Sequence, residues 1–305
     1  MTLQQIRYVL TINDSGTMIS AAEKLYISQP ALTASLKDLE NELGIRIFSR
    51  SPHGMTPTRD GASFIARARN LYQQYELLED AYSVESNRRQ EFGISTQHYS
   101  FVVQAFSQML QDFDTGKYHF SLLETTTTNI IRNVAEGRSE IGILYLSDYN
   151  SRYLKRLFTE NQLEFHPLIK CSAYVYLAKS HPLADRSSIT FEELMDYPCL
   201  QFEQGSQGSS FLAEEILSDR EYLRTITTND RATNLNLMKS INAYTLCSGI
   251  ISEELNGSDY IAVPFHEDRR HRNQSMTIGY LIPRGSVLNK IGTVFIEEIQ
   301  KLLQQ

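Results

Sequence analysis

Two groups of polar side chains are suited to recognising another molecule, and the first lies near the N-terminus. It begins at Ser28 and continues along a helix-forming stretch with amide, hydroxyl and ammonium groups on one side. A glutamine amide pairs with adenine, and a threonine hydrogen-bonds a base edge or contacts a thymine methyl group. We therefore predict that DNA is contacted by Ser28, Gln29, Pro30, Thr33, Ala34 and Lys37.

The second group follows two predicted strands in the next part of the chain. Parallel strands end at the same edge of a sheet, beside the N-termini of the helices that follow them. Hydroxyl, amide and free N–H groups at that edge suit a small anion or a polar metabolite. The alternative is that the threonines only cap helices. The residues of this group are Ser95, Thr96, Gln97, His98, Thr125 and Thr127.

Residues for catalysis or metal binding do not gather in this sequence. Nucleophile elbows, phosphate-binding glycine loops and the HExxH and CxxC motifs are absent, and the seven histidines are scattered. Cys171, Cys199 and Cys247 are far apart along the chain, so we expect reduced thiols, with a thiol-based redox sensor as the alternative. We expect no catalytic residue, no metal and no cofactor.

A helix-turn-helix is the element that positions the first group. Leu32, Leu36, Leu39 and Leu43 recur at helical spacing and give the helix an apolar stripe opposite its polar face. Ser28 is suited to cap this helix, and Pro30 is tolerated in its first turn. The segment 16–44 therefore predicts a helix that enters the DNA major groove.

A predicted β-hairpin follows this helix. Apolar and polar residues alternate around a Pro and Gly turn over residues 45–58. A hairpin beside a helix-turn-helix forms a wing that contacts phosphates or the minor groove. Arg50 and His53, near its tip, are the residues that we expect to make these contacts.

A long helix with a heptad seam connects the wing to the rest of the chain. Such a seam predicts a coiled coil, and hence a homodimer that places two recognition helices on a pseudo-palindromic site. The alternative is a helix packed on its own domain. The seam residues are Phe64, Ala68, Leu71, Tyr75, Leu78 and Tyr82.

Short apolar strands alternate with amphipathic helices after residue 91. Strands are predicted near 92–96, 120–124, 140–146, 171–178 and 276–282, with helices near 101–113, 129–136 and 287–303. This order predicts an α/β domain with a mostly parallel sheet.

Size and charge add limits to these predictions. A chain of 305 residues with 41% hydrophobic residues is expected to form more than one compact unit. The net charge of −7 lies within residues 91–305, because residues 1–90 hold equal numbers of basic and acidic residues. No apolar run spans a membrane and no signal peptide is recognisable, so we expect a cytoplasmic protein.

The N-terminal part resembles the winged helix-turn-helix of LysR-type transcriptional regulators. It departs from that pattern at Ile19, usually a hydroxyl residue, and at Ala34 and Asp38, where arginine is frequent. These departures affect base preference and phosphate contacts rather than the class. The matching pieces are Ser15-Gly16-Thr17, Ala21–Leu25, Ser28–Thr33, Leu39-Glu40, Leu43-Gly44, Phe48, Arg50 and Thr58-x-x-Gly61.

The remainder is similar to the LysR-type effector domain, a two-lobed fold like that of periplasmic binding proteins. The resemblance places Phe202 and Gln204 in the cleft between the lobes, with the residues after the predicted strands. Where the family has Gly-x-Gly in the second lobe, this chain has Ile241 and Ala243, which implies a narrower pocket. The matching pieces are Gly93-x-Ser95, Glu124-x-x-Thr127, Gly137-x-x-Glu140 and His181–Ala184.

Together these features predict a DNA-binding transcriptional regulator controlled by a small-molecule effector. A solute-binding protein without DNA activity is the alternative, which residues 1–60 disfavour. The expected partners are double-stranded promoter DNA, a small effector such as an anionic metabolite, a homodimer or homotetramer, and RNA polymerase. The predicted domains are residues 1–58 (DNA-binding), 59–90 (linker) and 91–305 (effector-binding), the last with lobe I at 91–162 and 265–305 and lobe II at 163–264.

Overall fold

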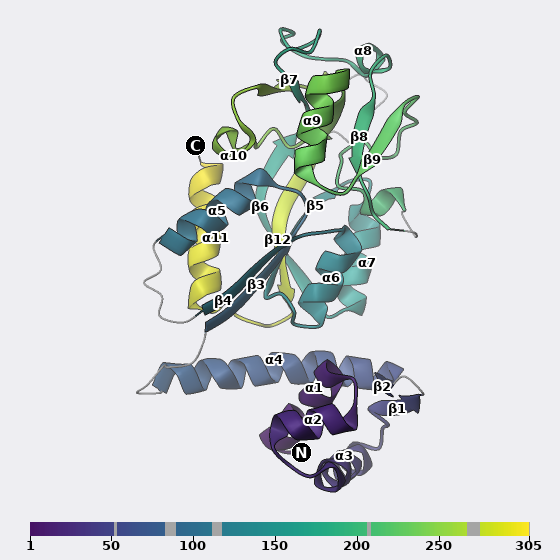
Figure 1. Cartoon of the computed structure of the whole chain (residues 1–305), viewed down its shortest axis with the longest axis vertical. Coiled ribbons are helices and arrows are strands. Elements are labelled where there is room, and N and C mark those ends of the chain that lie inside the picture. Colours follow the sequence, from purple (N-terminus) through teal and green to yellow (C-terminus); the bar gives the residue numbers. More distant parts are fainter. Residues whose placement is uncertain (52–53, 83–89, 112–117, 206–208, 267–274, 305) are drawn as a thin grey trace. The chain divides into compact units, whose positions relative to one another are not determined.

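Helices form most of the first part of the chain, and two sheets with flanking helices form the rest (Figure 1). A computed structural model describes residues 1–51, 54–82, 90–111, 118–205, 209–266 and 275–304. The chain divides into two units, Met1–Ser86 and Asn87–Gln305, which are treated separately below. No described helix is long and apolar enough to span a membrane.

The N-terminal unit consists of four helices and a two-stranded hairpin. Hydroxyl side chains cap its first three helices, because Thr2, Thr17 and Ser28 each accept a backbone N–H in the first turn. The elements are α1 (Leu3–Ser15), α2 (Met18–Leu25), α3 (Gln29–Leu43), β1 (Phe48–Ser51), β2 (Gly54–Pro57) and α4 (Arg59–Tyr82).

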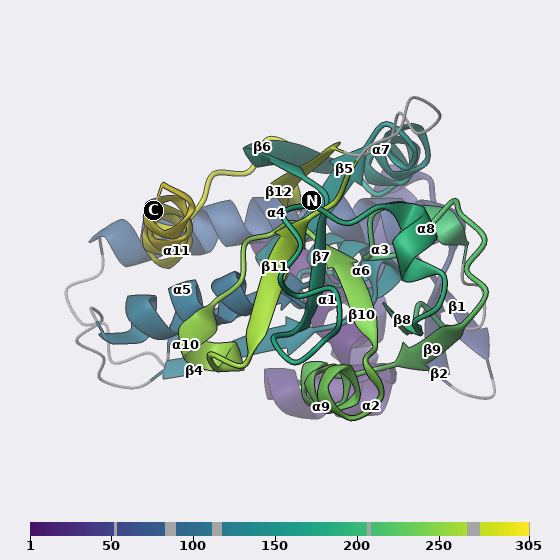
Figure 2. The same cartoon turned by 90° about the horizontal axis from the view of Figure 1, so that it is seen from above.

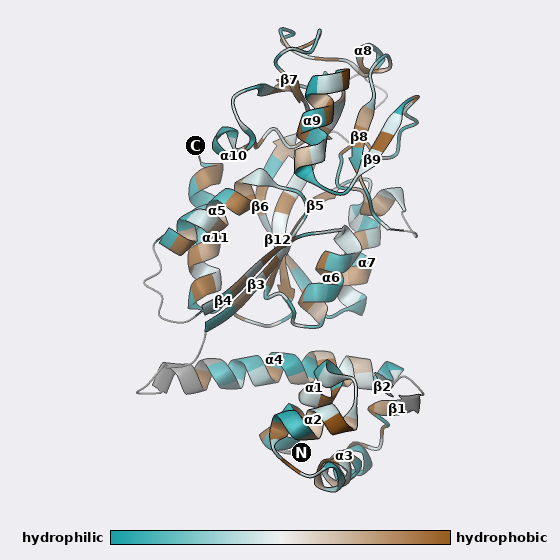
Figure 3. Cartoon of the chain, in the orientation of Figure 1, coloured by the Kyte–Doolittle hydropathy of each residue, from teal (hydrophilic) through white to brown (hydrophobic). Residues whose placement is uncertain are grey.

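One apolar core joins these elements. The leucine stripe of α3 packs with residues of α1, with the small residues of α2 and with the first turns of α4. Figure 3 shows helices with one hydrophobic and one hydrophilic side, as expected for helices that cover a core. Fully buried members of this core are Val9, Ile12, Ala21, Leu32, Leu39 and Ile47.

The C-terminal unit begins with a five-stranded sheet in the order β4-β3-β5-β12-β6. Strand β3 runs parallel to β4 and β5, whereas β12 is antiparallel to β5 and β6. Helices α5 and α11 cover one face, and α6 and α7 cover the other (Figure 1). The strands are β3 (Gln90–Thr96), β4 (Tyr118–Glu124), β5 (Ile141–Ser147), β6 (Leu163–Ser172) and β12 (Ser275–Pro283), and the helices are α5 (Ser100–Gln111), α6 (Thr127–Ala135), α7 (Ser151–Glu160) and α11 (Lys290–Leu303).

A second five-stranded sheet has the order β11-β7-β10-β8-β9, and Figure 2 shows β11, β7 and β10 as neighbours. Helix α9 packs against β7. The strands are β7 (Tyr174–Ala178), β8 (Cys199–Phe202), β9 (Thr225–Thr228), β10 (Tyr244–Cys247) and β11 (Tyr260–Pro264). The helices are α8 (Phe191–Leu194), α9 (Arg231–Ile241), α10 (Glu253–Asn256) and the 3₁₀ turn η1 (Ser210–Leu212).

The boundary predicted between the lobes at residue 163 is wrong. Strand β6 pairs with β12 from Leu163 to Ser172, so it completes the first sheet. The single strand predicted over 171–178 is divided at Ala173, where the chain crosses to the second sheet. The carbonyl of Ala173 accepts the N–H of Phe265 at 3.1 Å, which joins the two crossing segments. Lobe II therefore begins after Ser172.

Candidate functional sites

The predicted DNA-contacting residues lie on the exposed side of α3. Gln29, Pro30, Ala34 and Lys37 are exposed, and the half-buried Thr33 donates its hydroxyl to the carbonyl of Gln29 at 2.9 Å. Ser28 caps the helix, accepting the N–H of Ala31 at 3.4 Å. Buried leucines hold the opposite side in the core, so the polar face is available to another molecule.

The hairpin also forms as predicted. Strands β1 and β2 pair antiparallel, with Arg50 opposite Met55. His53 lies outside the described residues. The hairpin thus supplies a wing beside the recognition helix, within the same unit.

Glu40 is a positioning residue whose role the sequence analysis missed. Only 7% of it is exposed, and one carboxylate oxygen accepts the N–H groups of Ile47 at 2.7 Å and Phe48 at 3.2 Å. This carboxylate ties the start of the wing to the recognition helix. The sequence signal for this role is an acidic residue beside the leucines of the apolar stripe. A carboxylate at such a place is expected to be buried, and a buried carboxylate needs hydrogen-bond donors.

Two glycines fix the wing by close backbone approach. A Cβ at Gly61 would stand 1.9 Å from the carbonyl oxygen of Ile47. Gly54 has φ +120°, and a Cβ there would stand 2.3 Å from the carbonyl oxygen of Gly16, which also accepts the N–H of Met55 at 2.7 Å. No larger side chain fits either place without moving backbone.

The heptad seam predicted along α4 divides into two parts. Ala68 is buried in the core of its own unit, and the half-buried Phe64 packs against that core. The reason is that the first turns of α4 lie against α1. Leu71 and Leu78, by contrast, are 48% and 60% exposed, and Tyr75 is half-buried. Tyr82 is the last residue of the helix.

The polar residues at the end of β3 are buried inside lobe I. Ser95 shares hydrogen bonds with Ser139 at 2.8 Å and with the amide of Asn133 at 2.9 Å. Thr96 donates its hydroxyl to the neighbouring carbonyl at 2.8 Å. The Gln97 amide donates to Thr127 at 2.8 Å, and its oxygen accepts the hydroxyl of Tyr99 and the N–H of Tyr145.

These bonds correct the prediction that Ser95, Thr96, Gln97 and Thr127 line the effector pocket. None of the four lines the pocket described below, and each is at most 1% exposed. Their polar atoms are paired within the protein because a polar group enclosed by the fold needs an internal partner.

The N-terminus of α6 is closed by the second lobe. The side-chain oxygen of Gln204 accepts the N–H of Thr127 at 3.1 Å, and its amide nitrogen donates to Glu214 at 2.9 Å. Thr125 accepts from the amide of Asn129 at 3.0 Å. Gln204 therefore lies at the predicted interface between lobes, but neither it nor Thr125 lines the pocket.

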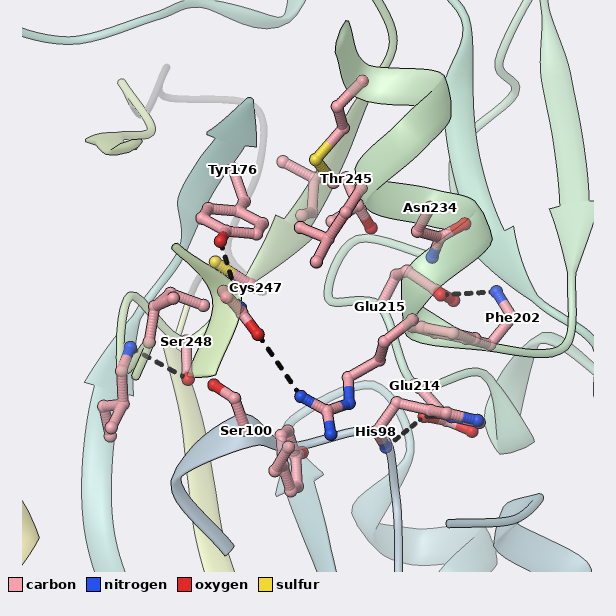
Figure 4. A pocket seen from close by; sticks show the side chains of 18 of the residues that line it. His98, Ser100, Tyr176, Phe202, Glu214, Glu215, Asn234, Thr245, Cys247 and Ser248 are labelled. Carbon is pink, nitrogen blue, oxygen red and sulfur yellow. Dashed lines mark hydrogen bonds and ion pairs between the residues drawn. The ribbon is translucent and has the colours of Figure 1, made fainter. Parts of the chain in front are cut away.

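A pocket of about 680 Å³, its open mouth included, lies between the β3–α5 loop and the second sheet (Figure 4). Two predicted residues, His98 and Phe202, line it, and their rings stack with centroids 3.8 Å apart. One part of its wall is polar and another is apolar. The lining residues that the sequence analysis missed include Tyr176, Glu214, Glu215, Arg231, Asn234 and Met238.

His98 and Glu214 form an ion pair at the floor of this pocket. One carboxylate oxygen of Glu214 lies 2.8 Å from Nδ1 of His98 and accepts its backbone N–H at 2.9 Å. Burial alone lowers the pKa of His98, but the hydrogen bond to Glu214 and the charges of the nearby glutamates outweigh it and raise the pKa.

Glu215 is a buried acid beside this pair. Burial, and then the charge of Glu214, raise the pKa of Glu215 to about 8, so it is mostly protonated at neutral pH. One of its oxygens accepts the N–H of Phe202 at 2.7 Å, and its backbone carbonyl accepts the hydroxyl of Tyr145 at 3.0 Å.

Arg231 joins the two lobes from the first turn of α9. Its Nε lies 2.8 Å from Glu124 at the end of β4, and Nη1 donates to Asn256 at 3.3 Å. The amide of Asn256 in turn donates to the hydroxyl of Tyr176 at 3.0 Å. Arg231, Asn256 and Tyr176 all line the pocket.

The cysteines lack the setting of a reactive thiol. Burial raises the pKa of Cys171 to about 11 and that of Cys247 to about 12, and it raises the pKa of the 1%-exposed Cys199 well above its usual range. In the part of the chain that the structure describes, no group of three or more metal-ligating side chains occurs.

Two family models match most of the chain. Residues 3–62 match the model described as a bacterial regulatory helix-turn-helix protein of the lysR family, and residues 94–304 match the LysR substrate binding domain. The two matches fall on the recognition helix with its wing and on the two-lobed unit with its pocket.

Individual proteins agree with these matches. The uncharacterised regulator YbhD of Escherichia coli K12 is 23% identical over 94% of this chain and 87% of its own length. The regulator cbl of the same organism is 24% identical over 97% of this chain and 92% of its own. A full-length OxyR from Pseudomonas aeruginosa shares the fold, with a TM-score of 0.68, 19% identity and coverage of 98% of this chain and 95% of that one.

Proposed function

This chain belongs to the LysR family of bacterial transcriptional regulators, and on that premise we propose how its own residues bind DNA and an effector. Its N-terminal unit binds promoter DNA, and its C-terminal unit binds a small molecule that controls this activity. We place the DNA-binding domain at 1–58, the linker at 59–90 and the effector-binding domain at 91–305. Within the last, lobe I takes 91–172 and 265–305, and lobe II takes 173–264.

The exposed polar face of α3 carries the proposal for DNA binding. Gln29 at the helix tip and Thr33 one turn later contact base edges, while Lys37 contacts phosphate. Arg50 and His53 in the wing reach the backbone of the same site. Residues 1–90 carry no net charge, so affinity depends on base contacts and on two copies binding together.

Leu71 and Leu78 carry the proposal for the dimer. They lie one heptad apart on α4 and expose large apolar side chains, which a second copy of the helix would bury. Such a dimer presents two recognition helices to one DNA site.

The pocket carries the proposal for control. Its walls come from both lobes, since His98 belongs to lobe I whereas Phe202, Glu215 and Asn234 belong to lobe II. A ligand there binds one arrangement of the lobes better than another, and this difference drives the regulatory change. We further propose that the chain is not an enzyme and that it acts in the cytoplasm on promoter DNA.

Selection of DNA fragments by the full-length chain, followed by footprinting, tests this function. We expect one enriched sequence with two half-sites, protected on successive turns of the duplex. Leu71→Asp with Leu78→Asp should abolish the paired footprint while leaving the N-terminal unit folded. Binding to all fragments alike would contradict the proposal.

A further inference from the structure

The pocket contains a buried hydrogen-bond donor that has no acceptor in the part of the chain that the structure describes, the side-chain amide of Asn234 in lobe II. Asn234 is 3% exposed, and its side-chain oxygen accepts the hydroxyl of Thr228 at 2.5 Å. Its amide nitrogen is buried and has no partner among the described residues. Asn234 lines the pocket, and Figure 4 shows its amide nitrogen on the side of Glu215. A buried N–H group that lacks an acceptor is costly, so a missing partner is expected there.

Arg231 adds a second donor on the same face of α9. It precedes Asn234 by three residues, which places the two side chains one above the other on this 11-residue helix. Nη1 donates to Asn256 at 3.3 Å, whereas Nε lies 2.8 Å from Oε1 of Glu124 but is buried and makes no hydrogen bond among the described residues. The guanidinium therefore has an N–H group without an acceptor among them, and its side chain lines the pocket.

Glu215 supplies a third polar group. One of its carboxyl oxygens accepts the N–H of Phe202 at 2.7 Å. The raised pKa of Glu215 favours the protonated form, and a protonated carboxyl group is able to donate one hydrogen bond. Three groups that can donate thus line the same cavity.

The rest of the cavity sets limits on charge and shape. The positive charge of Arg231 is shared with Glu124, and His98 is paired with Glu214, so no surplus positive charge is present to hold a dianion. Hydrocarbon side chains cover the remaining wall. They include Leu235, Met238, Leu246 and Ile251.

We propose that the effector is a monocarboxylate with an apolar body. Its carboxylate accepts hydrogen bonds from Arg231 and Asn234, and Glu215 donates to it when protonated. The apolar body lies against Met238 and its hydrocarbon neighbours. The inference rests on the proposed function, because it takes this pocket to be the effector site.

Three simple ligands of different charge test the proposed chemical class of the effector on the full-length protein. Hexanoate, hexylamine and inorganic sulfate are compared by calorimetry and by thermal shift. We expect hexanoate to bind in the millimolar range that is usual for so small a ligand, and to bind at least roughly tenfold more tightly than the other two. Failure of hexanoate to bind, or binding of hexylamine as tight as that of hexanoate, would overturn the proposal.

Three variants test the named donors. Asn234→Asp keeps the acceptor for Thr228 but replaces the free donor with an acceptor, and should weaken hexanoate binding by roughly tenfold or more. Arg231→Gln should weaken it by a similar factor. Glu124→Gln breaks the same ion pair from the other side but frees Arg231 for the ligand, so it should tighten binding.

A purely structural ion pair gives a different pattern. Arg231→Gln and Glu124→Gln would then change hexanoate binding in the same direction, which would overturn the assignment of Arg231. Retention of full hexanoate affinity in Asn234→Asp would overturn the assignment of Asn234 as a hydrogen-bond donor to the ligand.

A pocket-narrowing variant separates this inference from the proposed function. Leu235 lines the pocket, so Leu235→Trp should narrow it while keeping Arg231, Asn234 and Glu215 in the chain. If hexylamine binds in place of hexanoate and Leu235→Trp abolishes that binding, the pocket is the effector site but the carboxylate class is wrong. If Leu235→Trp leaves the affinity of the bound probe unchanged, the site itself is misplaced and the proposed function fails with it.

Discussion

Polar residues at the start of α3 face outward, whereas polar residues at the end of β3 face inward. Gln29 and Lys37 are exposed because a leucine stripe holds the opposite side of their helix. Ser95 lies near the end of β3 and Gln97 directly after it, and because this strand is covered on both faces, both residues find partners inside the lobe. The same residue types are thus available to another molecule in one region and hold the fold together in the other.

The difference follows from how each element is covered. A helix on one side of a small domain keeps a solvent face, whereas the end of a central parallel strand lies beneath the helices that follow it. Helix α9 differs again, because Nδ2 of Asn234 is buried without a hydrogen-bond partner among the described residues and its side chain lines the pocket.

The largest expected effect is on the buried carboxylate that supports the recognition helix. Glu40→Ala should lower the free energy of unfolding of the N-terminal unit by about 3 kcal/mol, because two buried backbone N–H groups lose their acceptor. Glu40→Gln keeps an acceptor oxygen and should lose less. Chemical denaturation measures both.

A matched control for this position lies on the same helix. Glu42, an exposed partner of the N-terminal amine, should change stability by no more than about 0.5 kcal/mol when replaced by Ala. Equal denaturation midpoints for Glu40→Ala and Glu42→Ala would show that Glu40 does not support the wing.

The next largest loss of stability is expected when the buried amide of Gln97 is removed. Gln97→Leu should lower the stability of the C-terminal unit by about 2 kcal/mol, since Thr127, Tyr99 and Tyr145 each lose a partner. Thermal unfolding of the full chain measures it. An unchanged melting temperature together with lost ligand binding would instead make Gln97 a ligand-binding residue.

Gln29 should show the opposite behaviour. Gln29→Ala should leave the melting temperature unchanged but cost about 1–3 kcal/mol of discrimination between the selected DNA site and its single-base variants. Gln4, an exposed glutamine on α1, is the control, and its replacement by Ala should leave discrimination intact. Competition gel shifts measure both, and equal behaviour of the two variants would contradict the assignment of α3.

The last effect concerns the dependence of stability on pH. The pKa of Glu215 is raised from 4.5 to about 8, so between these values the folded protein keeps a proton that the unfolded chain releases. The free energy of unfolding therefore falls as pH rises from about 4.5 to 8. Glu214 and His98 face the carboxyl group of Glu215. Glu215→Gln removes this titrating group, so the free energy of unfolding of the variant should fall less steeply as pH rises.

Thermal scans at several pH values test this directly. At pH 8 Glu215→Gln should melt above the wild type, because each pH unit between about 4.5 and 8 costs the wild type roughly 1.4 kcal/mol of stability that the variant does not lose. At pH 4.5 the two proteins should melt together. Parallel curves across the whole range would show that Glu215 is not protonated in the fold.

Sequence alone sufficed for the elements that repeat locally. The leucine spacing of α3, its Ser28 cap and the alternating residues of the two wing strands are signals within a few residues, and each formed as predicted. A heptad pattern does not state whether a helix packs on its own domain or on a partner, and the pattern of α4 did not reveal that Phe64 and Ala68 pack on their own unit.

The pocket depended on contacts between distant residues. Gln204 meets Thr127 across 77 positions, and Glu214 meets His98 across 116. No local pattern marks Arg231 or Asn234, which acquire their roles only when α9 of lobe II faces the end of β4 in lobe I. The crossing at Ala173, which decides the lobe boundary, depends likewise on the pairing of β6 with β12.

The central claim is that DNA recognition and effector binding depend on different residues. The most direct test measures discrimination between DNA sites and affinity for hexanoate on the same two variants. Gln29→Ala should lose discrimination and keep wild-type hexanoate affinity. Asn234→Asp should lose hexanoate affinity and keep wild-type DNA binding in the absence of ligand. Loss of both properties in either variant, or loss of neither, would contradict the account.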